Sequence, residues 1–186
     1  NGGNHGGGIS VVDFQLGAAT IANNTIVANN GAGIYWANTW PPNDNNIITF
    51  NTLGFERGIA GTSDAEIRFN DVFGNAVLGT PANYRGTADR TSSEGNFSSD
   101  PGFSNFAIGE LHLQPDSPCV NAGNTTFAPT NWVDLDHQAR VQGGTVDVGA
   151  DESDGTTWNV QTPIVRVSPV GDDTDGTTWA KAKRTV

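Results

Sequence analysis

The stretch TIANNTIVANN, residues 20–30, decides the fold of this chain, because it returns twice in altered form. The related segments are NIITFNTLGFE at residues 46–56 and EIRFNDVFGNA at residues 66–76. Aligned with one another, the three segments share an apolar column, which holds Ile21, Ile48 and Ile67. Three residues further on is an asparagine column, which holds Asn24, Asn51 and Asn70. Two residues after that is a second apolar column, which holds Ile26, Leu53 and Val72. An internal repeat of this length is typical of an architecture built from stacked units.

A second repeated motif ends in Gly-Ile and occurs at residues 7–9, 32–34 and 57–59. Its central glycines, Gly8, Gly33 and Gly58, are evenly spaced. Alternating apolar and polar residues predict short strands, and Gly and Asn suit sharp turns because they accept positive φ at little cost. We therefore predict stacked coils with isoleucines inside and asparagines sharing amide hydrogen bonds at the bends. The stretch WANTWPPNDN, residues 36–45, is predicted to be an inserted loop.

An antiparallel β-sandwich is the alternative fold, since it is also rich in short strands and glycine. The pair Asn30-Gly31 is of the kind that forms tight hairpins. It falls inside the repeat rather than between recurring hairpins, so the stacked coil is favoured.

Composition limits the classes of partner. The chain has 186 residues, 20 Asp and Glu against 9 Lys and Arg, and a net charge of −11. Nucleic-acid binding needs a basic surface, so we expect no nucleic-acid partner. No apolar run approaches the ~20 residues of a membrane-spanning helix, so no membrane span is expected. The single cysteine, Cys119, is expected to be a small buried apolar residue, with an intermolecular disulfide as the alternative.

Longer motifs resemble a known family. The stretch ATIANNTIVANNGAGIYW, residues 19–36, resembles one coil of the right-handed parallel β-helix of secreted microbial proteins related to pectate lyases and polymorphic outer-membrane proteins. Residues 70–86 resemble the last coil of that family. SSDPGFSNFAIGELHLQPDSPCVNAGN at residues 98–124 and DLDHQARVQGGTVDVGADE at residues 134–152 resemble its closing segment. The resemblance implies an all-β, right-handed parallel β-helix (a β-solenoid) that is secreted and extracellular or bound at the cell surface.

The tail RVSPVGDDTDGTTWAKAKRTV, residues 166–186, resembles the first strand and cap of the same family. The chain is thus divided into four parts. They are β-helix coils at 1–80, the last coil and closing segment at 81–152, a linker at 153–163 and a cap-like tail at 164–186.

Two explanations fit this order of parts. In the first, the sequence is a window onto a longer tandem protein. In the second, the tail of one copy completes the open first coil of its neighbour, head to tail, and builds a filament. The donated apolar residues would be Val165, Val167, Val170 and Trp179, and the receiving residues would be Ile9, Val11 and Ile21. We therefore expect a non-enzymatic structural subunit of a surface layer or filament, whose partners are copies of itself. A tail that caps its own body is a further alternative.

An enzymatic role is the main alternative, because relatives with this fold include polysaccharide lyases and hydrolases. The coils contain no lysine, so Arg57 and Arg68 are the candidates for a lyase base. Asp64 and Glu66 alternate and would share a strand face, as a hydrolase pair would. All four are better explained as solvated surface residues, and no catalytic residue is assigned.

Candidate ligand sites are few. Tyr35, Trp36 and Trp40 are predicted to form a projecting aromatic loop, which would suit polysaccharide binding by an adhesin. Asp172, Asp173 and Asp175 crowd one loop and form a candidate Ca²⁺ site. A second acidic cluster is expected in the closing segment, from Asp134, Asp136, Asp147 and Asp151. The histidines His5, His112 and His137 show no metal-ligand spacing.

Overall fold

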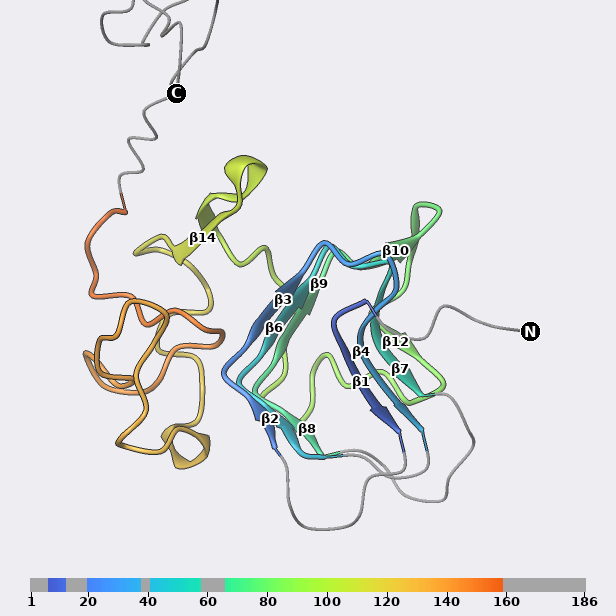
Figure 1. Ribbon diagram of the computed structural model, residues 1–186, viewed down its shortest axis with the longest axis horizontal. Helices are drawn as coiled ribbons and strands as arrows, with labels where there is room; N and C mark the ends of the chain where they lie inside the picture. The colour runs from blue at the N-terminus through green and yellow to red at the C-terminus, as the bar shows by residue number, and fades with distance from the viewer. Residues whose placement is uncertain (1–6, 13–19, 38–40, 58–65, 159–186) are drawn as a thin grey trace, which may run out of the picture.

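The computed structural model describes residues 7–12, 20–37, 41–57 and 66–158. Within these ranges the chain is all-β, without an α-helix, and its only helical turns are 3₁₀ turns at Phe106–Ile108 and Thr125–Phe127. Most strands belong to three parallel sheets that surround one apolar core (Figure 1). The class predicted from the sequence, all-β with parallel strands, is confirmed.

Each sheet collects one strand from every pass of the chain. The first sheet has the order β1, β4, β7 and β12, which span Ile9–Val12, Ala32–Ala37, Leu53–Arg57 and Tyr84–Arg85. The second contains β2 (Ile21–Ala22), β5 (Asn43–Asp44) and β8 (Ile67–Arg68). The third contains β3 (Thr25–Val27), β6 (Ile47–Thr49) and β9 (Asp71–Phe73). The chain therefore visits the sheets in the same order on successive passes.

Two small antiparallel pairs lie outside these sheets. The first pairs β10 (Ala76–Val77) with β11 (Thr80–Pro81), and the second pairs β13 (Phe103–Asn105) with β14 (Glu110–Leu113). The β14 strand matters for the site described below, because it carries His112.

The interior is filled by apolar side chains that stack from pass to pass. Eight buried residues form the main cluster, namely Ile21, Ile26, Ile34, Trp36, Ile48, Phe55, Ile67 and Val72. Phe55 lies between two other rings, with its centroid 5.9 Å from that of Trp36 and 5.7 Å from that of Tyr84. No single pass could bury these side chains alone, so stacking is the source of the core.

Two ladders of asparagine side chains run along the bends on either side of the third sheet. One contains Asn24, Asn46, Asn70 and Asn96, and the other contains Asn29, Asn51, Asn75 and Asn83. Each Nδ2 donates to the Oδ1 of the next asparagine, over 2.9–3.1 Å in the first ladder and 2.9–3.0 Å in the second. The same Oδ1 accepts the backbone N–H of the preceding member, as Asn70 does from Asn46 at 2.9 Å.

The residue before the ladder asparagine turns the chain. At the first bend, Asn23, Asn45 and Phe69 have φ values of 56°, 54° and 53°. At the second bend, Ala28 and Phe50 have φ values of 55° and 56°. This left-handed conformation costs about 1 kcal/mol or more for a residue with a side chain, so the ladder hydrogen bonds must hold it.

The predicted register of the middle segment is wrong. Ile48 pairs with Ile26 and Val72, not with Ile21 and Ile67. Asn51 correspondingly belongs to the second ladder, with Asn29 and Asn75. The two bends of each pass lie close together and carry the same apolar-x-x-Asn pattern, so an alignment shifted from one bend to the other fits nearly as well.

The glycines that stack from pass to pass are Gly8, Gly33 and Gly54, whereas Gly58 was predicted as the last of them. A Cβ on Gly8 would lie 2.4 Å from the carbonyl oxygen of Gly33, and one on Gly33 would lie 3.2 Å from that of Gly54. Gly54 therefore takes the place predicted for Gly58, which lies outside the described residues. Residues 36–45 are not one inserted loop, since they include the end of β4 and all of β5.

The irregular segment from residue 98 onward packs against the outward side of the third sheet (Figure 1). Ile47, at 0% exposure, contacts this segment in a cluster with Leu113, Cys119 and Val148. Backbone groups also join the two parts, because the N–H of Gly149 donates to the carbonyl of Asn45 over 2.9 Å.

Cys119 is a free thiol and is fully buried, which confirms the prediction that it is a small buried residue. It lies beside the buried carboxyl group of Asp71. Its Sγ donates to Oδ2 of Asp71 over 3.5 Å, and the N–H of Ser99 donates to Asp71 Oδ1 over 3.0 Å. Burial raises the pKa of Asp71 to about 7. Burial and the adjacent Asp71 also raise the pKa of the Cys119 thiol, which disfavours the reactive thiolate form.

Removing one ladder amide should destabilise the whole stack. The change Asn46→Ala leaves the N–H and Nδ2 of Asn24 without their acceptor and removes the Nδ2 donor to Asn70 Oδ1, which keeps only the backbone N–H of residue 46. Because a buried unsatisfied group costs about 1–3 kcal/mol, we expect a loss of about 3 kcal/mol or more in the free energy of unfolding. Urea titration measures it, with exposed Asn30→Ala as the matched control expected to stay within about 0.5 kcal/mol. Equal losses in both variants would contradict the ladder account.

Asp71 should make the chain less stable as the pH rises. In the unfolded chain this carboxyl ionises above its ordinary pKa of 3.8, whereas the folded chain keeps it protonated to about pH 7. The stability it contributes is therefore present below pH 3.8 and is lost as the pH rises through about 7.

The variant Asp71→Asn should lose this dependence and be more stable than the original chain at pH 8, on the order of 2 kcal/mol. Urea unfolding at intervals from pH 4 to 8 measures the slope. The exposed Asp116→Asn provides a control with the same change of charge. An unchanged slope in Asp71→Asn would show that Asp71 is already ionised in the folded chain.

Candidate functional site

Among the described strands, β1, β2 and β3 lie at one common end of the three parallel sheets. Each is the terminal strand of its sheet and has a neighbouring strand on one side only within the described residues. A strand edge of this kind presents unpaired N–H and C=O groups, which can pair with another chain.

The asparagine ladders distinguish the two ends of the stack. At the far end, Nδ2 of Asn96 donates to the carbonyls of Ile67 and Ser93, both over 2.7 Å. Asn83 ends the second ladder by donating to the carbonyl of Val72 over 2.8 Å. At the β1–β3 end, by contrast, no described residue donates a hydrogen bond to Oδ1 of Asn24 or Asn29. The described residues therefore satisfy the far end, whereas they supply no donor to these two acceptors at the β1–β3 end.

The three residues predicted to receive a donated strand lie in these edge strands. Ile9 and Val11 are half-buried in β1 and pack against the main core. Ile21 lies in β2 and is 8% exposed. Their predicted partners Val165, Val167, Val170 and Trp179 lie outside the described residues, as do Asp172, Asp173 and Asp175.

The prediction of a projecting aromatic loop is wrong for two of its three residues. Tyr35 and Trp36 belong to β4 and are only 6% and 1% exposed. Trp36 packs edge-on against Phe55 in the core. Because buried rings cannot stack on a sugar, neither residue can form the predicted glycan surface, and Trp40 lies outside the described residues.

The candidate catalytic arginine Arg68 is held by other side chains. Its Nε and Nη2 donate to the two carboxylate oxygens of Asp44 over 2.8 and 3.2 Å. Its guanidinium also lies 4.3 Å above the ring of Phe127. The hydrogen bond with Asp44 is the main cause that raises the pKa of Arg68, which makes it less suited to accept a proton.

The other candidate catalytic residues do not form a shared site in the described chain. Arg57 ends β7 in the first sheet, whereas Arg68 belongs to β8 in the second. Glu66 forms an ion pair with Arg68 over 3.2 Å, and Asp64 lies outside the described residues.

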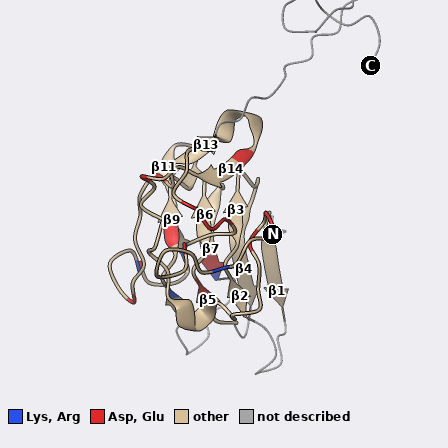
Figure 2. Ribbon diagram, turned by 90° about the vertical axis from the view of Figure 1, so that its left-hand side faces the viewer, with Lys and Arg blue, Asp and Glu red and all other residues tan. Residues whose placement is uncertain are grey.

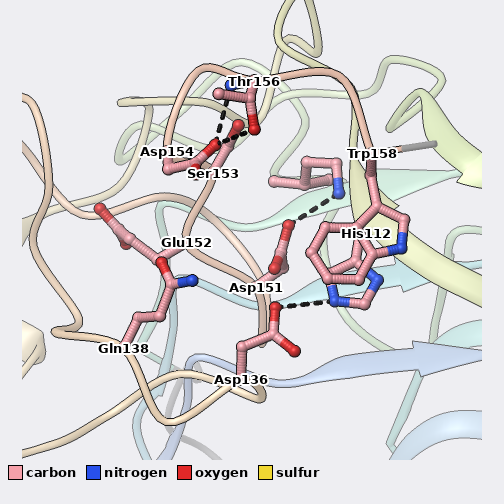
Figure 3. Close-up of a pocket in the computed structure, with 10 residues that line it drawn as sticks. His112, Asp136, Gln138, Asp151, Glu152, Ser153, Asp154, Thr156 and Trp158 are labelled. Carbon is pink, nitrogen blue, oxygen red and sulfur yellow. Dashed lines mark hydrogen bonds and ion pairs between the residues drawn. The ribbon is translucent and has the colours of Figure 1, made fainter.

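A cluster of ionisable side chains gathers in the irregular segment, at His112, Asp136 and Asp151 (Figure 3). Nε2 of His112 lies 2.8 Å from Oδ2 of Asp136, and its Nδ1 contacts Oε1 of Glu110. Glu110 and His112 are two residues apart on β14, so their side chains share one face of the strand.

Backbone hydrogen bonds fix the two aspartates from separate turns. Asp134 accepts the N–H groups of Asp136 and Gln138 over 2.9 and 2.8 Å, which shapes the turn that carries Asp136. Asp151 accepts the N–H of Leu113 over 2.7 Å. Both carboxylates therefore lie beside β14.

Trp158 covers the histidine. The two rings stack with centroids 3.6 Å apart and planes 12° apart. Together with both aspartates they line a cavity of about 20 Å³, in which the candidate ligand atoms lie within 4.8 Å of one another. A cavity this small holds about one water molecule or ion.

The charges of this cluster affect one another. Burial alone would lower the pKa of His112, but hydrogen bonds with Glu110 and Asp136 outweigh it and raise the pKa. Burial raises the pKa of Asp151. No described lysine or arginine forms an ion pair with Asp136 or Asp151, although His112 lies beside both and the charge of Arg140 also acts on Asp151.

The acidic cluster predicted in this segment is correct in part. Asp136 and Asp151 come together, but Asp134 shapes a turn instead. Asp147 accepts the N–H groups of Asn121 and Ser153 over 2.6 and 2.7 Å. His112 was missed because Asp136 is 24 residues away and no local spacing links them.

Two further observations concern possible partners. Asp and Glu residues are spread over the strands and the irregular segment, in keeping with the net charge of −11 (Figure 2). The absence of a nucleic-acid partner stays a prediction.

The described residues contain no helix with the length and apolar character required to cross a membrane.

Comparison of the chain with protein-family models, with characterised proteins and with solved structures finds no match. The resemblance of its motifs to secreted β-helix proteins therefore stays a prediction.

Proposed function

We propose that this chain is a right-handed parallel β-helix and a non-enzymatic structural subunit of an extracellular surface layer or filament. In this proposal, subunits join head to tail when the strand and cap at residues 164–186 of one copy complete the β1–β3 end of the next. The observation that carries the proposal is the common end of the three parallel sheets at β1, β2 and β3.

The asymmetry of the ladders supports addition at this end. Asn96 and Asn83 complete the hydrogen bonds of the far end, whereas Asn24 and Asn29 offer acceptors at the β1–β3 end. An incoming strand can donate its backbone N–H groups to such acceptors and to the edge of β1, which is the chemistry of β-strand addition.

Apolar patterning supports the same pairing. Residues on β1 alternate between half-buried and exposed, with Ile9 and Val11 toward the core. The tail alternates in the same way at Val165, Arg166 and Val167. A strand from the tail would thus place valines over the core and arginine toward solvent.

The ion pairs of the arginines favour a structural role over an enzymatic one. Arg68 is bound to Asp44, and Arg85 forms an ion pair with Glu56 across β12 and β7. Guanidinium groups bound in this way link neighbouring strands of a sheet and are poor bases.

Deleting residues 164–186 should abolish assembly. The shortened chain keeps every described residue, so we expect a folded monomer by light scattering and no filaments by negative-stain electron microscopy. The full chain should form filaments at the same concentration. Filaments that persist after the deletion would contradict the proposal, and a full chain that stays monomeric would favour a tail that caps its own body.

A peptide of residues 164–186 should bind the shortened chain with one site per chain, as measured by fluorescence anisotropy. The matched control peptide carries Val165→Ser and Val167→Ser, which removes the apolar side chains while keeping the length and charge. We expect at least about tenfold weaker binding of the control, because each valine buried on binding contributes about 1.5 kcal/mol or more. Equal binding of both peptides would point to charge rather than strand addition.

A further inference from the structure

We propose that His112, Asp136 and Asp151 bind one divalent transition-metal ion, with Zn²⁺ as the best fit. The ion would join β14 to the two turns that carry the aspartates, and so hold the irregular segment together beside the third sheet. This proposal does not depend on assembly through the tail.

The histidine is oriented as a metal ligand is. Its Nε2 points toward the carboxylate of Asp136, and its Nδ1 contacts Glu110 (Figure 3 shows the ring between Asp136 and Trp158). A metal-bound histidine usually has a carboxylate hydrogen-bonded to its second ring nitrogen. This carboxylate fixes the orientation of the ring and increases the basicity of the nitrogen that binds the metal. The stack with Trp158 restricts ring rotation further.

The spacing of the donor atoms suits one ion. Ligand atoms at about 2.0–2.2 Å from a zinc ion lie about 3–4 Å from one another. The three candidate donors lie within 4.8 Å of one another around a cavity of about 20 Å³. Only small side-chain movements are needed to bring all three into contact with an ion in this cavity.

Charge and burial give an independent reason for a cation. Asp151 is 4% exposed, and its single described hydrogen bond comes from the N–H of Leu113. The nearby guanidinium of Arg140 donates instead to the carbonyls of Ala150 and Gly149, over 2.7 and 2.8 Å. A buried carboxylate with so few hydrogen bonds and no ion pair to a lysine or arginine is costly, and a metal ion would neutralise it.

The donor set selects the class of metal. One imidazole nitrogen with two carboxylates suits Zn²⁺ and related transition metals, whereas Ca²⁺ takes oxygen ligands and six or more of them. Three protein donors leave a fourth position for water. This site is distinct from the calcium loop predicted at Asp172, Asp173 and Asp175.

Isothermal titration of the metal-stripped chain with ZnCl₂ tests the proposal. We expect one Zn²⁺ per chain, bound more tightly than Ca²⁺, and at least about tenfold weaker binding in Asp136→Asn. The control Asp116→Asn removes the same charge from an exposed position outside the cavity and should bind zinc as the original chain does. No binding, or equal affinities in the two variants, would overturn the proposal.

A second measurement tests the site without mutating any of the three metal-binding residues. The histidine ring signals of the chain are followed by NMR during the zinc titration, with signals assigned through His137→Gln. The ring of His112 should shift with one equivalent of Zn²⁺, whereas exposed His137 should not. A shift confined to His137 or His5 would place the metal elsewhere and reject the site.

Discussion

The side-chain amide of asparagine, repeated from pass to pass, is the interaction on which the rest of this structure depends. Each sharp bend places residues such as Asn45 and Phe69 at positive φ and interrupts strand pairing, which would leave buried backbone groups without partners. The side-chain amide of the asparagine that follows supplies both a donor and an acceptor. Asparagine alone therefore satisfies backbone groups at the bend and links each pass to the next. Short strands can then stack in register, and the apolar core from Ile21 to Val72 follows from that register.

In each ladder every amide donates to the next asparagine in the same direction, so the two ends of the stack differ in their hydrogen bonds. Asn96 and Asn83 turn their amides back to backbone carbonyls and finish the stack. Asn24 and Asn29 keep an acceptor free of described donors, at the same end as the sheet edges. The irregular segment covers Ile47 on the side of the third sheet, and it also contacts the first pass, where Arg140 donates to Asn23 and Ala150 to Thr25.

Sequence periodicity predicted what depends on local pattern. It identified short strands, the parallel class, and Asn24 and Asn70 as members of one ladder, whereas the burial of Cys119 was expected from how free cysteines usually behave. It misplaced Asn51, because two equivalent bends in each pass carry the same motif and only the three-dimensional stack distinguishes them. Trp36 was taken for a loop residue because the unequal steps of the repeat made residues 36–45 an apparent insertion, whereas its strand partners bury it. His112 could not be linked to Asp136 and Asp151, since three separate segments meet there through tertiary packing.

Hydrogen–deuterium exchange of the full chain, compared between dilute monomer and concentrated assembly, tests the central claim that chains add at the β1–β3 end. The account predicts slower exchange on assembly in residues 9–12 and 21–27, which contain these strands, and in the tail. Exchange in residues 84–97, at the finished end of the stack, should change little. Protection confined to residues 84–97, or spread evenly over the chain, would contradict the account.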